Sequence, residues 1–459
     1  MDRGLYFKTH KNCYYYDDTT GKIKIVEEMP EKYIIYGDKK YNKRSINEAD
    51  VKQELDVKGF TQLTLIVTQG CNIRCKYCVY SGEYDNSRQH TNVNMNFEIA
   101  KKALGMYFEY VKQKKMKFPL FIPEVSFYGG EPLVNFKVIK QSVEYIQQIY
   151  SGRVDYNITT NACLLTDEIM DFFCEHNFIL SISLNGDKQE HDRLRVYADG
   201  KGTYNAAMNA LHKLSAKYPE YFKNSCYVIG VYDYGTDLLR MNDFFENEKL
   251  LYKKLLMYSP VVEVGTDWYS QYSDLEKERF LKQYNYLKED YLEKMKKGIK
   301  HSQLQDALFH FADLQIINRP VDCGIEELTS GLLPNVGACI PGHKIAVDPY
   351  GSIHACERVN DKMPIGTVYT GLNYNKIAEI LTKYNQVLYP KCINCPISRL
   401  CPHCYQALLD GEGNFDLKRV RDCEVFIDIR RNQMIQTYSI LEENSDVNTF
   451  LYRGVNEYE

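Results

Sequence analysis

Three cysteines stand close together early in the chain, in the spacing Cys71-x3-Cys75-x2-Cys78. They follow an apolar run, 63–67, so we expect a strand to end where they begin. Three thiolates on one short loop can hold three irons of a [4Fe–4S] cube and leave the fourth iron open to another ligand. A structural zinc site requires four ligands. His90 lies twelve residues beyond Cys78, so the sequence offers no fourth ligand nearby and favours an open iron–sulfur cluster.

A second and larger group of cysteines lies in the C-terminal third of the chain. Its members are Cys323, Cys339, Cys356, Cys392, Cys395, Cys401, Cys404 and Cys423, among 15 cysteines in all. In a reducing compartment such clustering indicates metal binding or catalysis rather than disulfides. Zinc and iron–sulfur sites share the Cys-x2-Cys spacing, so one four-cysteine zinc site at residues 392–404 is an alternative. The number of available cysteines favours iron–sulfur clusters.

The elements that position the first cysteines alternate between strand and helix. Apolar strands are expected at 63–67, 125–128, 156–159, 179–184, 226–231 and 254–258, with amphipathic helices at 96–112, 135–150, 166–176, 204–217 and 237–246. This order predicts an α/β fold with a parallel sheet. Six units are too few for a closed eight-stranded barrel, so we expect a partial (β/α)6 barrel. Active sites of such sheets lie at the carboxyl ends of the strands.

The rest of the chain divides around this core. We expect a strand-rich N-terminal unit at 1–60, the core at 61–300, a bridging helix and loop at 301–338, a cysteine-rich domain at 339–430 and a helical tail at 431–459. In the N-terminal unit, two strands flank an Asp-Asp-Thr-Thr-Gly turn, Tyr33–Tyr36 forms a third, and Ser45 caps a helix. Residues 344–356 read as a hairpin, and helices are expected at 274–297 and 303–318.

The composition narrows the possible functions. The chain has 459 residues, 44% of them hydrophobic, and a net charge of −4. This balance gives no case for nucleic-acid or anionic-membrane binding. No stretch has the roughly 18 apolar residues of a membrane helix, and the N-terminus has no apolar core of signal-peptide length. We therefore expect a cytoplasmic protein.

Polar or glycine-rich segments follow the later strands at the same edge of the sheet. They are Gly129-Gly130-Glu131 after the second strand, Asn161 after the third, and the segment from Ser183 to Arg195 after the fourth. Paired glycines let a ligand approach the backbone closely. A glutamate can accept from an ammonium group, and an arginine fork suits a carboxylate.

With the cysteine spacing, these segments resemble the radical S-adenosylmethionine (SAM) superfamily over about residues 61–260. The resemblance implies that SAM chelates the open iron and is cleaved by one electron to methionine and a hydrogen-abstracting 5′-deoxyadenosyl radical. It also implies that Tyr77 packs against adenine, that Gly129, Gly130 and Glu131 meet the amino group, and that Asn161, Ser183 and Arg195 hold the rest of SAM. Asn185 stands where aspartate is usual, and Arg193 competes with Arg195.

The C-terminal cysteines resemble the SPASM domain of radical SAM enzymes that modify peptides and proteins. The resemblance implies two auxiliary [4Fe–4S] clusters. Cys392, Cys395, Cys401 and Cys423 would hold one, and Cys339, Cys356 and Cys404 the other, with Cys323 as a possible fourth ligand. Two residues separate Cys401 from Cys404 where the family usually has three. Glu357 matches an acid that serves as general base in sulfatase-maturing relatives, and a solvated surface role is the alternative.

The resulting functional prediction is a maturase of a ribosomally made peptide. The favoured chemistry is a sulfur-to-carbon thioether link, with carbon–carbon linkage or other oxidation as alternatives. A leader peptide would bind residues 1–60 by strand addition, and a donor such as ferredoxin or flavodoxin would supply electrons. The rivals are a sulfatase-type maturase that makes formylglycine and a non-catalytic iron–sulfur or zinc-binding regulator.

Overall fold

The parallel sheet at the centre of the molecule has the predicted order. The computed structural model describes residues 3–39, 45–321, 332–419 and 423–444. Its six parallel strands are β5 (Gln62–Thr68), β6 (Glu124–Gly129), β7 (Asp155–Thr160), β8 (Ile179–Ser183), β9 (Cys226–Tyr232) and β10 (Leu255–Pro260). They lie side by side in chain order, with β10 at one end of the sheet. The sheet is open, so the predicted partial barrel is confirmed.

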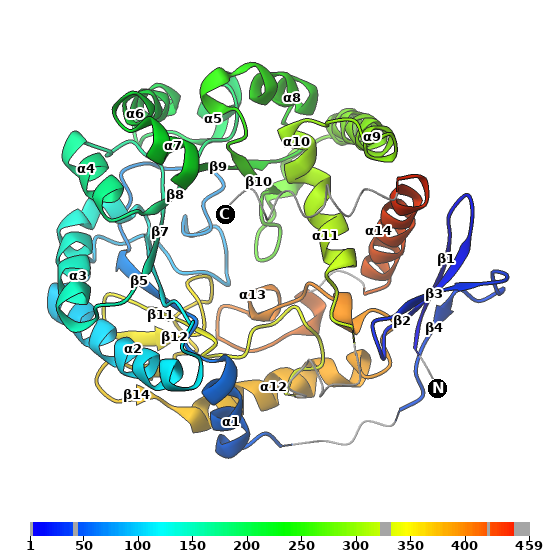
Figure 1. The fold of residues 1–459 in the computed structure, drawn as a ribbon, viewed down its shortest axis with the longest axis horizontal. Coiled ribbons are helices and arrows are strands. Elements are labelled where there is room, and N and C mark those ends of the chain that lie inside the picture. Colours follow the sequence, from blue (N-terminus) through cyan, green and yellow to red (C-terminus); the bar gives the residue numbers. More distant parts are fainter. Residues whose placement is uncertain (1–2, 40–44, 322–331, 420–422, 445–459) are drawn as a thin grey trace.

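The helices between these strands cover the outer face of the sheet, as Figure 1 shows. They are α2 (Phe97–Lys117), α3 (Phe136–Ile149), α4 (Asp167–Glu175), α5 (Lys188–Leu194), α6 (Tyr204–Lys217), α7 (Pro219–Ser225) and α8 (Leu238–Asn247). Side-chain caps fix several starts: Asn96 accepts from the Ile99 amide and Thr166 from the Ile169 amide. Their apolar faces and the strands share one hydrophobic core.

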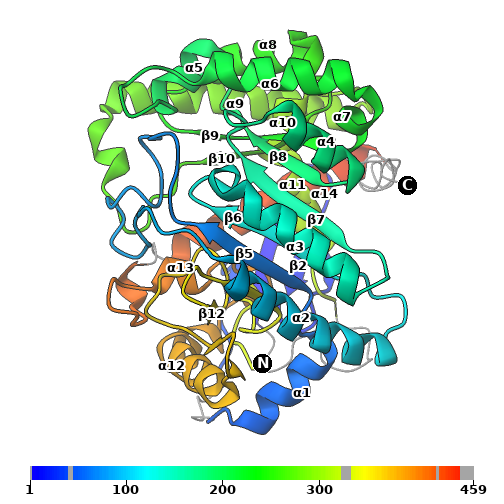
Figure 2. The same cartoon turned by 90° about the vertical axis from the view of Figure 1, so that its left-hand side faces the viewer.

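The cysteine-rich region joins the same sheet instead of forming a separate one. β11 (Lys344–Val347) pairs parallel with β5 and antiparallel with β12 (Ser352–His354), and β13 (Gly366–Thr367) and β14 (Gly371–Leu372) extend the sheet. The predicted hairpin is present, but its attachment to β5 was not predicted. The region also contains α12 (Tyr374–Cys392), which was not predicted. Figure 2 shows this region directly below β5.

The N-terminal residues form a small antiparallel sheet of their own. Its order is β3 (Ile23–Val26), β2 (Cys13–Asp17), β1 (Gly4–Lys8) and β4 (Ile34–Ile35), and β1 was not predicted. Helix α1 (Glu48–Lys58) is capped by Asn47 and not by Ser45, because the Asn47 side chain accepts from the Ala49 and Asp50 amides. α1 packs against α12, away from this small sheet.

The C-terminal helices connect the small sheet to the core. α9 (Asp274–Lys296) is followed by α10 (Gln303–Gln305), a π-helical turn at Asp306–His310 and α11 (Phe311–Ile317), which follow one another without a break, so the helix expected at 303–318 is present and contains a π-helical turn. α14 (Cys423–Glu443) packs against α9, α11 and β1 and runs across the predicted boundary at residue 430. Within the described ranges, no helix is long and apolar enough to cross a membrane.

Candidate active site

The first three cysteines lie on the loop that leaves β5, at the carboxyl edge of the parallel strands. Burial, together with negative charge at Glu131, Cys75 and Cys78, raises the pKa of the Cys71 thiol to about 12. A thiol in this position becomes a thiolate when a cation binds it. The donor set therefore fits a metal cluster better than a free nucleophile.

His90 lies beside this loop, although it is twelve residues from Cys78 in sequence. Its Nε2 is 3.3 Å from the Cys78 sulfur, and its Nδ1 is 3.1 Å from the Gln69 carbonyl oxygen, to which it donates. The sequence predicted no further ligand near the three cysteines, and this prediction is wrong because the fold brings His90 next to Cys78. The position of this imidazole beside a ligand sulfur makes His90 a candidate for adjusting the cluster's potential.

The glycine pair after β6 is required by the protein backbone. A Cβ on Gly129 would lie 2.3 Å from the Thr68 carbonyl oxygen, and one on Gly130 would lie 2.3 Å from that of Gly70. The amide of Glu131 donates to the same Gly70 oxygen at 2.9 Å. In this structure Gly129 and Gly130 leave room for the backbone around the cysteine loop. The sequence had suggested that they leave room for a ligand.

A Gly130→Ala substitution should therefore displace the cysteine loop. We expect the variant to lose at least half of the iron held by Cys71, Cys75 and Cys78, measured as iron per chain together with SAM cleavage. Gly105→Ala is the matched control, because its Cβ would meet only the Tyr145 hydroxyl at 3.7 Å. Alanine should stabilise α2 there by about 1 kcal/mol. Full iron in Gly130→Ala would contradict this role of the close approach.

Glu131 ties the ends of β6 and β7 to the cysteine loop. Its buried carboxylate accepts from the Thr160 hydroxyl at 2.7 Å, the Asn161 amide at 2.8 Å and the Leu133 amide at 3.2 Å. The Asn161 side chain in turn donates to Asn72 Oδ1 at 2.8 Å, inside the cysteine loop. A carboxylate offers about four acceptor positions, so one remains beyond these three.

Tyr77 and Arg195 meet on the other side of the loop. Arg195 Nη1 donates to the Tyr77 hydroxyl at 2.6 Å, and that hydroxyl donates to Asn185 Oδ1 at 3.3 Å. Arg195 Nε and Asn185 Nδ2 are buried donors without a protein acceptor. Buried donors normally have partners, so this corner fits a ligand rich in oxygen and nitrogen acceptors, as SAM is.

The competing arginine is engaged elsewhere. Arg193 forms ion pairs with Glu190 and with Asp233, the latter at 2.8 Å. Arg195 instead lies close enough to Cys75 that negative charge there raises the pKa of its guanidinium. Ser183 is half-buried at the last position of β8. Of the two arginines, the structure brings Arg195 to the cysteine loop.

Four cysteines of the second group line one cavity of about 300 Å³. They are Cys392, Cys395, Cys401 and Cys423. Sulfurs around a tetrahedral zinc ion lie about 3.8 Å apart, yet among the described residues no three cysteine sulfurs lie within 4.8 Å of one another. The sulfurs are therefore farther apart than those around a mononuclear zinc ion. Cys404 does not line this cavity, contrary to the four-cysteine zinc alternative.

The remaining described cysteines of that group lie close enough to Tyr405 to affect its pKa. The pKa of the Tyr405 phenol is raised well above its ordinary value, first by burial and then by negative charge at Cys339, Cys404 and Cys356. Its hydroxyl is buried and has no hydrogen-bond partner. These three cysteines therefore lie near one buried phenol, whereas the other four line the cavity described above. Cys323, the expected fourth ligand, lies outside the described residues.

The N-terminal sheet is attached to the four-cysteine cavity by a buried carboxylate. Asp18 is fully buried and accepts from the Ser398 hydroxyl at 2.6 Å and the Arg399 amide at 2.9 Å. It also pairs with Arg3 at 3.0 Å. Arg3 donates to the carbonyl oxygen of Cys392 at 3.2 Å. Arg3, just before β1, and Asp18, just after β2, thus hold the segment from the end of α12 that carries Cys392, Cys395 and Cys401.

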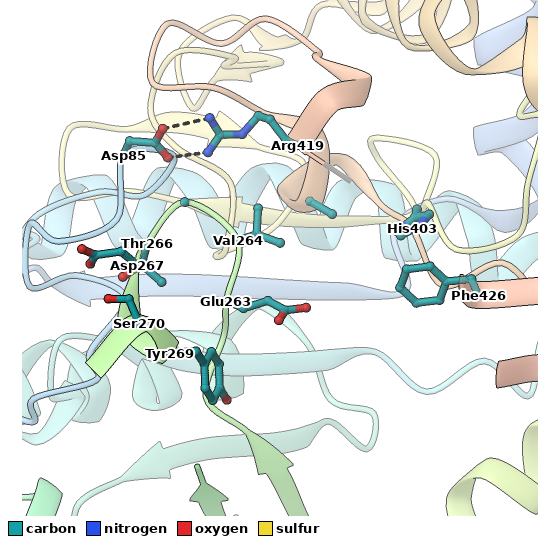
Figure 3. Close-up of a pocket in the computed structure, with 12 residues that line it drawn as sticks. Asp85, Glu263, Val264, Thr266, Asp267, Tyr269, Ser270, His403, Arg419 and Phe426 are labelled. Atoms are coloured by element: carbon teal, nitrogen blue, oxygen red, sulfur yellow. Dashed lines mark hydrogen bonds and ion pairs between the residues drawn. The ribbon is translucent and has the colours of Figure 1, made fainter. Parts of the chain in front are cut away.

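An open cavity of about 620 Å³ lies between the core and the cysteine-rich region. The loop after β10 forms one wall, with Glu263, Asp267 and Tyr269, and His403, Ala407, Arg419 and Phe426 form the other. Figure 3 shows Asp85 and Arg419 paired at its rim, with His403 and Phe426 together farther along. The His403 and Phe426 rings pack edge to face, with their centroids 4.5 Å apart. The cavity has acidic, basic and aromatic walls, which suits a peptide.

Glu357 lies between the two halves of the site. Its side chain is half-buried, with 17% of its surface exposed, and its carboxylate is 3.9 Å from Lys344 Nζ. Its carbonyl oxygen accepts from the Tyr80 hydroxyl at 3.2 Å and from Arg88. Because Tyr80 follows the first cysteine loop and Glu357 follows Cys356, this contact joins the two cysteine regions.

Comparisons with known proteins agree with this geometry. The radical SAM superfamily profile matches residues 65–238. The chain is 22% identical to the radical SAM cyclopropyl synthase TigE of Paramaledivibacter caminithermalis, over 90% of this chain and 83% of that protein. It is 28% identical to a serine-type anaerobic sulfatase-maturating enzyme of Bacteroides thetaiotaomicron, over 42% of this chain and 44% of that protein.

The fold is also similar to that of native anSMEcpe with bound AdoMet, with a TM-score of 0.57 and 18% identity, over 85% of this chain and 99% of that one. The matched superfamily segment is the one that carries the cysteine loop and the strand ends described above. Membership implies a [4Fe–4S] cluster and SAM as cofactors, as the sequence predicted. Residues 65–238 of this enzyme therefore form a radical SAM domain, and the chain as a whole is similar to radical SAM enzymes, a sulfatase-maturating enzyme among them.

Proposed function

We propose that this enzyme modifies a peptide and holds three [4Fe–4S] clusters to do so. The cluster at Cys71, Cys75 and Cys78 binds SAM. The auxiliary clusters are held by Cys392, Cys395, Cys401 and Cys423, and by Cys339, Cys356 and Cys404. The four-cysteine cavity and the separate gathering of three sulfurs at Tyr405 support this division.

When bound, SAM and the clusters supply a hydrogen-abstracting adenosyl radical and an acceptor for the second electron. The residues of this chain bind SAM and hold the cysteine loop in position. Arg195 and Asn185 offer their unpartnered buried donors to SAM, and Tyr77 lies beside them. Glu131 fixes Asn161 against the cysteine loop. A donor of the ferredoxin or flavodoxin type supplies the first electron.

The substrate site is the cavity between the β10 loop and the cysteine-rich region, and this position is the observation that carries the proposal. Tyr84 follows the first cysteine loop and donates to the carbonyl oxygens of Tyr77 at 3.2 Å and Val262 at 3.4 Å. Asn86 donates to the Gln406 carbonyl oxygen at 2.9 Å. A peptide in the cavity would thus contact elements tied to both cysteine regions.

The favoured reaction forms a thioether in the bound peptide. A peptide C–H bond and a cysteine S–H bond break and one C–S bond forms, while a proton is released and the hydrogen atom and the electron pass to the acceptors named above. Three described cysteines at the Tyr405 site leave room for a substrate thiolate if a fourth protein ligand is absent. Similarity to a cyclopropyl synthase over 90% of the chain favours carbon–carbon closure as the second candidate.

The test uses the anaerobically reconstituted enzyme with SAM, dithionite and cysteine-containing peptides encoded beside the gene. Mass spectrometry with thiol alkylation separates the outcomes. Loss of two hydrogen atoms with a blocked thiol supports the thioether, and the same loss with a reactive thiol supports carbon–carbon closure. An aldehyde trapped by a hydrazine identifies sulfatase-type formylglycine chemistry and refutes both. SAM cleavage in wild type at all excludes a non-catalytic regulator.

Filling the cavity should separate peptide binding from SAM cleavage. We expect Ala407→Phe to weaken peptide affinity by about tenfold or more, because the added ring occupies the cavity wall. SAM cleavage without peptide should stay near the wild-type rate. Ala407→Ser, of similar volume, is the control. Binding is measured by fluorescence anisotropy of a labelled peptide, and unchanged affinity in Ala407→Phe would remove the cavity as the substrate site.

A further inference from the structure

A third group of possible metal ligands lies away from every cysteine discussed above. His301, Asp306 and His310 each place one ligand atom within 4.8 Å of the other two. This is the one such group among the described residues. We propose that these three side chains bind a divalent transition-metal ion of the Zn²⁺ type. The proposal is independent of the clusters and of the reaction.

The local backbone explains how the three side chains meet. His301 precedes α10, where Ser302 caps the helix by accepting from the Gln305 amide. Asp306 and His310 are the first and last residues of the π-helical turn. The four-residue separation keeps both on one side of the helix. π-Helical turns are uncommon and occur frequently at functional sites, so the irregular geometry here has a candidate explanation.

Each of the two imidazole rings has a nitrogen atom that could bind a metal ion and has no hydrogen-bond partner. His301 contacts the Asp306 carboxylate through Nε2, and its side chain is only 9% exposed. The Nδ1 atoms of His301 and His310 are both buried without a hydrogen-bond partner. Buried polar atoms without partners are rare in native proteins. A bound ion would engage an imidazole of each residue.

The ligand types select the ion. Two imidazole nitrogens and one carboxylate oxygen match zinc and related divalent metals, with ligand distances of about 2.0–2.2 Å. The absence of a thiolate from the group disfavours an iron–sulfur cluster. The Asp306 side chain is 49% exposed, so the ion could enter from solvent and water could complete its coordination.

The position suggests a structural role for the ion. Gln303, two residues after His301, accepts from the amides of Lys254 at 3.1 Å and Leu255 at 3.0 Å, at the start of β10. The ion would therefore fix the segment that holds β10 in the sheet. β10 leads into the loop that lines the open cavity. Metal binding should accordingly raise thermal stability without being needed for SAM cleavage.

The experiment titrates Zn²⁺ into the fully reconstituted holoenzyme, measuring zinc and iron per chain after dialysis. We expect about one zinc per chain in wild type, with iron unchanged and a higher melting temperature. Asp306→Asn is nearly isosteric and half-exposed, so it should fold, and its zinc affinity should fall about 10-fold or more. His310→Ala should bind about 100-fold more weakly.

His212→Ala is the matched control, since His212 is exposed on α6. It should bind zinc as wild type does. Equal zinc binding by wild type, Asp306→Asn and His310→Ala would overturn the proposal, as would no zinc beyond that which displaces iron. SAM cleavage unaffected by Asp306→Asn would leave the proposed function standing, so the two proposals fail separately.

Discussion

Replacing Cys71, Cys75 and Cys78 together with alanine should lower the iron content of the reconstituted enzyme from about twelve to about eight atoms per chain. SAM cleavage under dithionite should fall to background, because no iron remains to bind SAM. The auxiliary sites should keep their iron, since their cysteines lie on other segments. Iron and sulfide analysis with a SAM-cleavage assay measures both effects.

The control variant replaces two cysteines that belong to none of the three proposed cluster sites. Cys13 and Cys174 lie outside both groups, and Cys13→Ala/Cys174→Ala should keep all the iron and full SAM cleavage. A wild type with about four irons, together with zinc and a triple variant with none, would contradict the proposal of auxiliary clusters. In that case the C-terminal cysteines would be structural, whatever their spacing.

Asp18→Ala should cost the enzyme one auxiliary cluster. The substitution leaves the Ser398 hydroxyl, the Arg399 amide and the Arg3 guanidinium without their shared acceptor. Removing one partner of a buried ion pair costs about 3–5 kcal/mol. Because these groups hold the loop of Cys392, Cys395 and Cys401, we expect iron to fall by about four atoms per chain. Thermal unfolding and iron analysis report the two effects.

Asp17→Ala is the matched control for Asp18→Ala. The Asp17 carboxylate accepts from the Thr19 amide and the Thr20 hydroxyl within its own turn and does not reach the cysteine loop in these contacts. It should keep its iron. Full iron in Asp18→Ala would show that the N-terminal sheet is dispensable to the cluster. That result would favour leader-peptide binding as the main role of residues 1–60.

The core of the fold could be predicted because its signals are local. The strands from β5 to β10 are short segments that are apolar throughout or at alternate positions, and Asn96, Thr166 and Asp237 are side-chain caps that mark helix starts. The first cysteine loop is a single contiguous motif. Its placement at the carboxyl edge then follows from the parallel order of the strands.

The missed features depend on contacts between distant segments. The pairing of β11 with β5 and the approach of His90 to Cys78 have no local sequence signal. The division of the C-terminal cysteines was available only from family resemblance, because Cys401 and Cys404 are near neighbours that face different sites. The role of Asp18 was hidden in what reads as an ordinary turn.

The pairing of β11 with β5 has a consequence for synthesis on the ribosome. β5 emerges early, but the strand that covers its outer edge is encoded about 280 residues later. At about 5–20 residues per second, the edge of β5 waits for roughly 15–55 s. During that interval Leu63 and Leu65, which are fully buried in the finished protein, belong to an unpaired edge strand. The nascent chain therefore needs protection from aggregation, and slow translation of residues 68–344 should lower its yield.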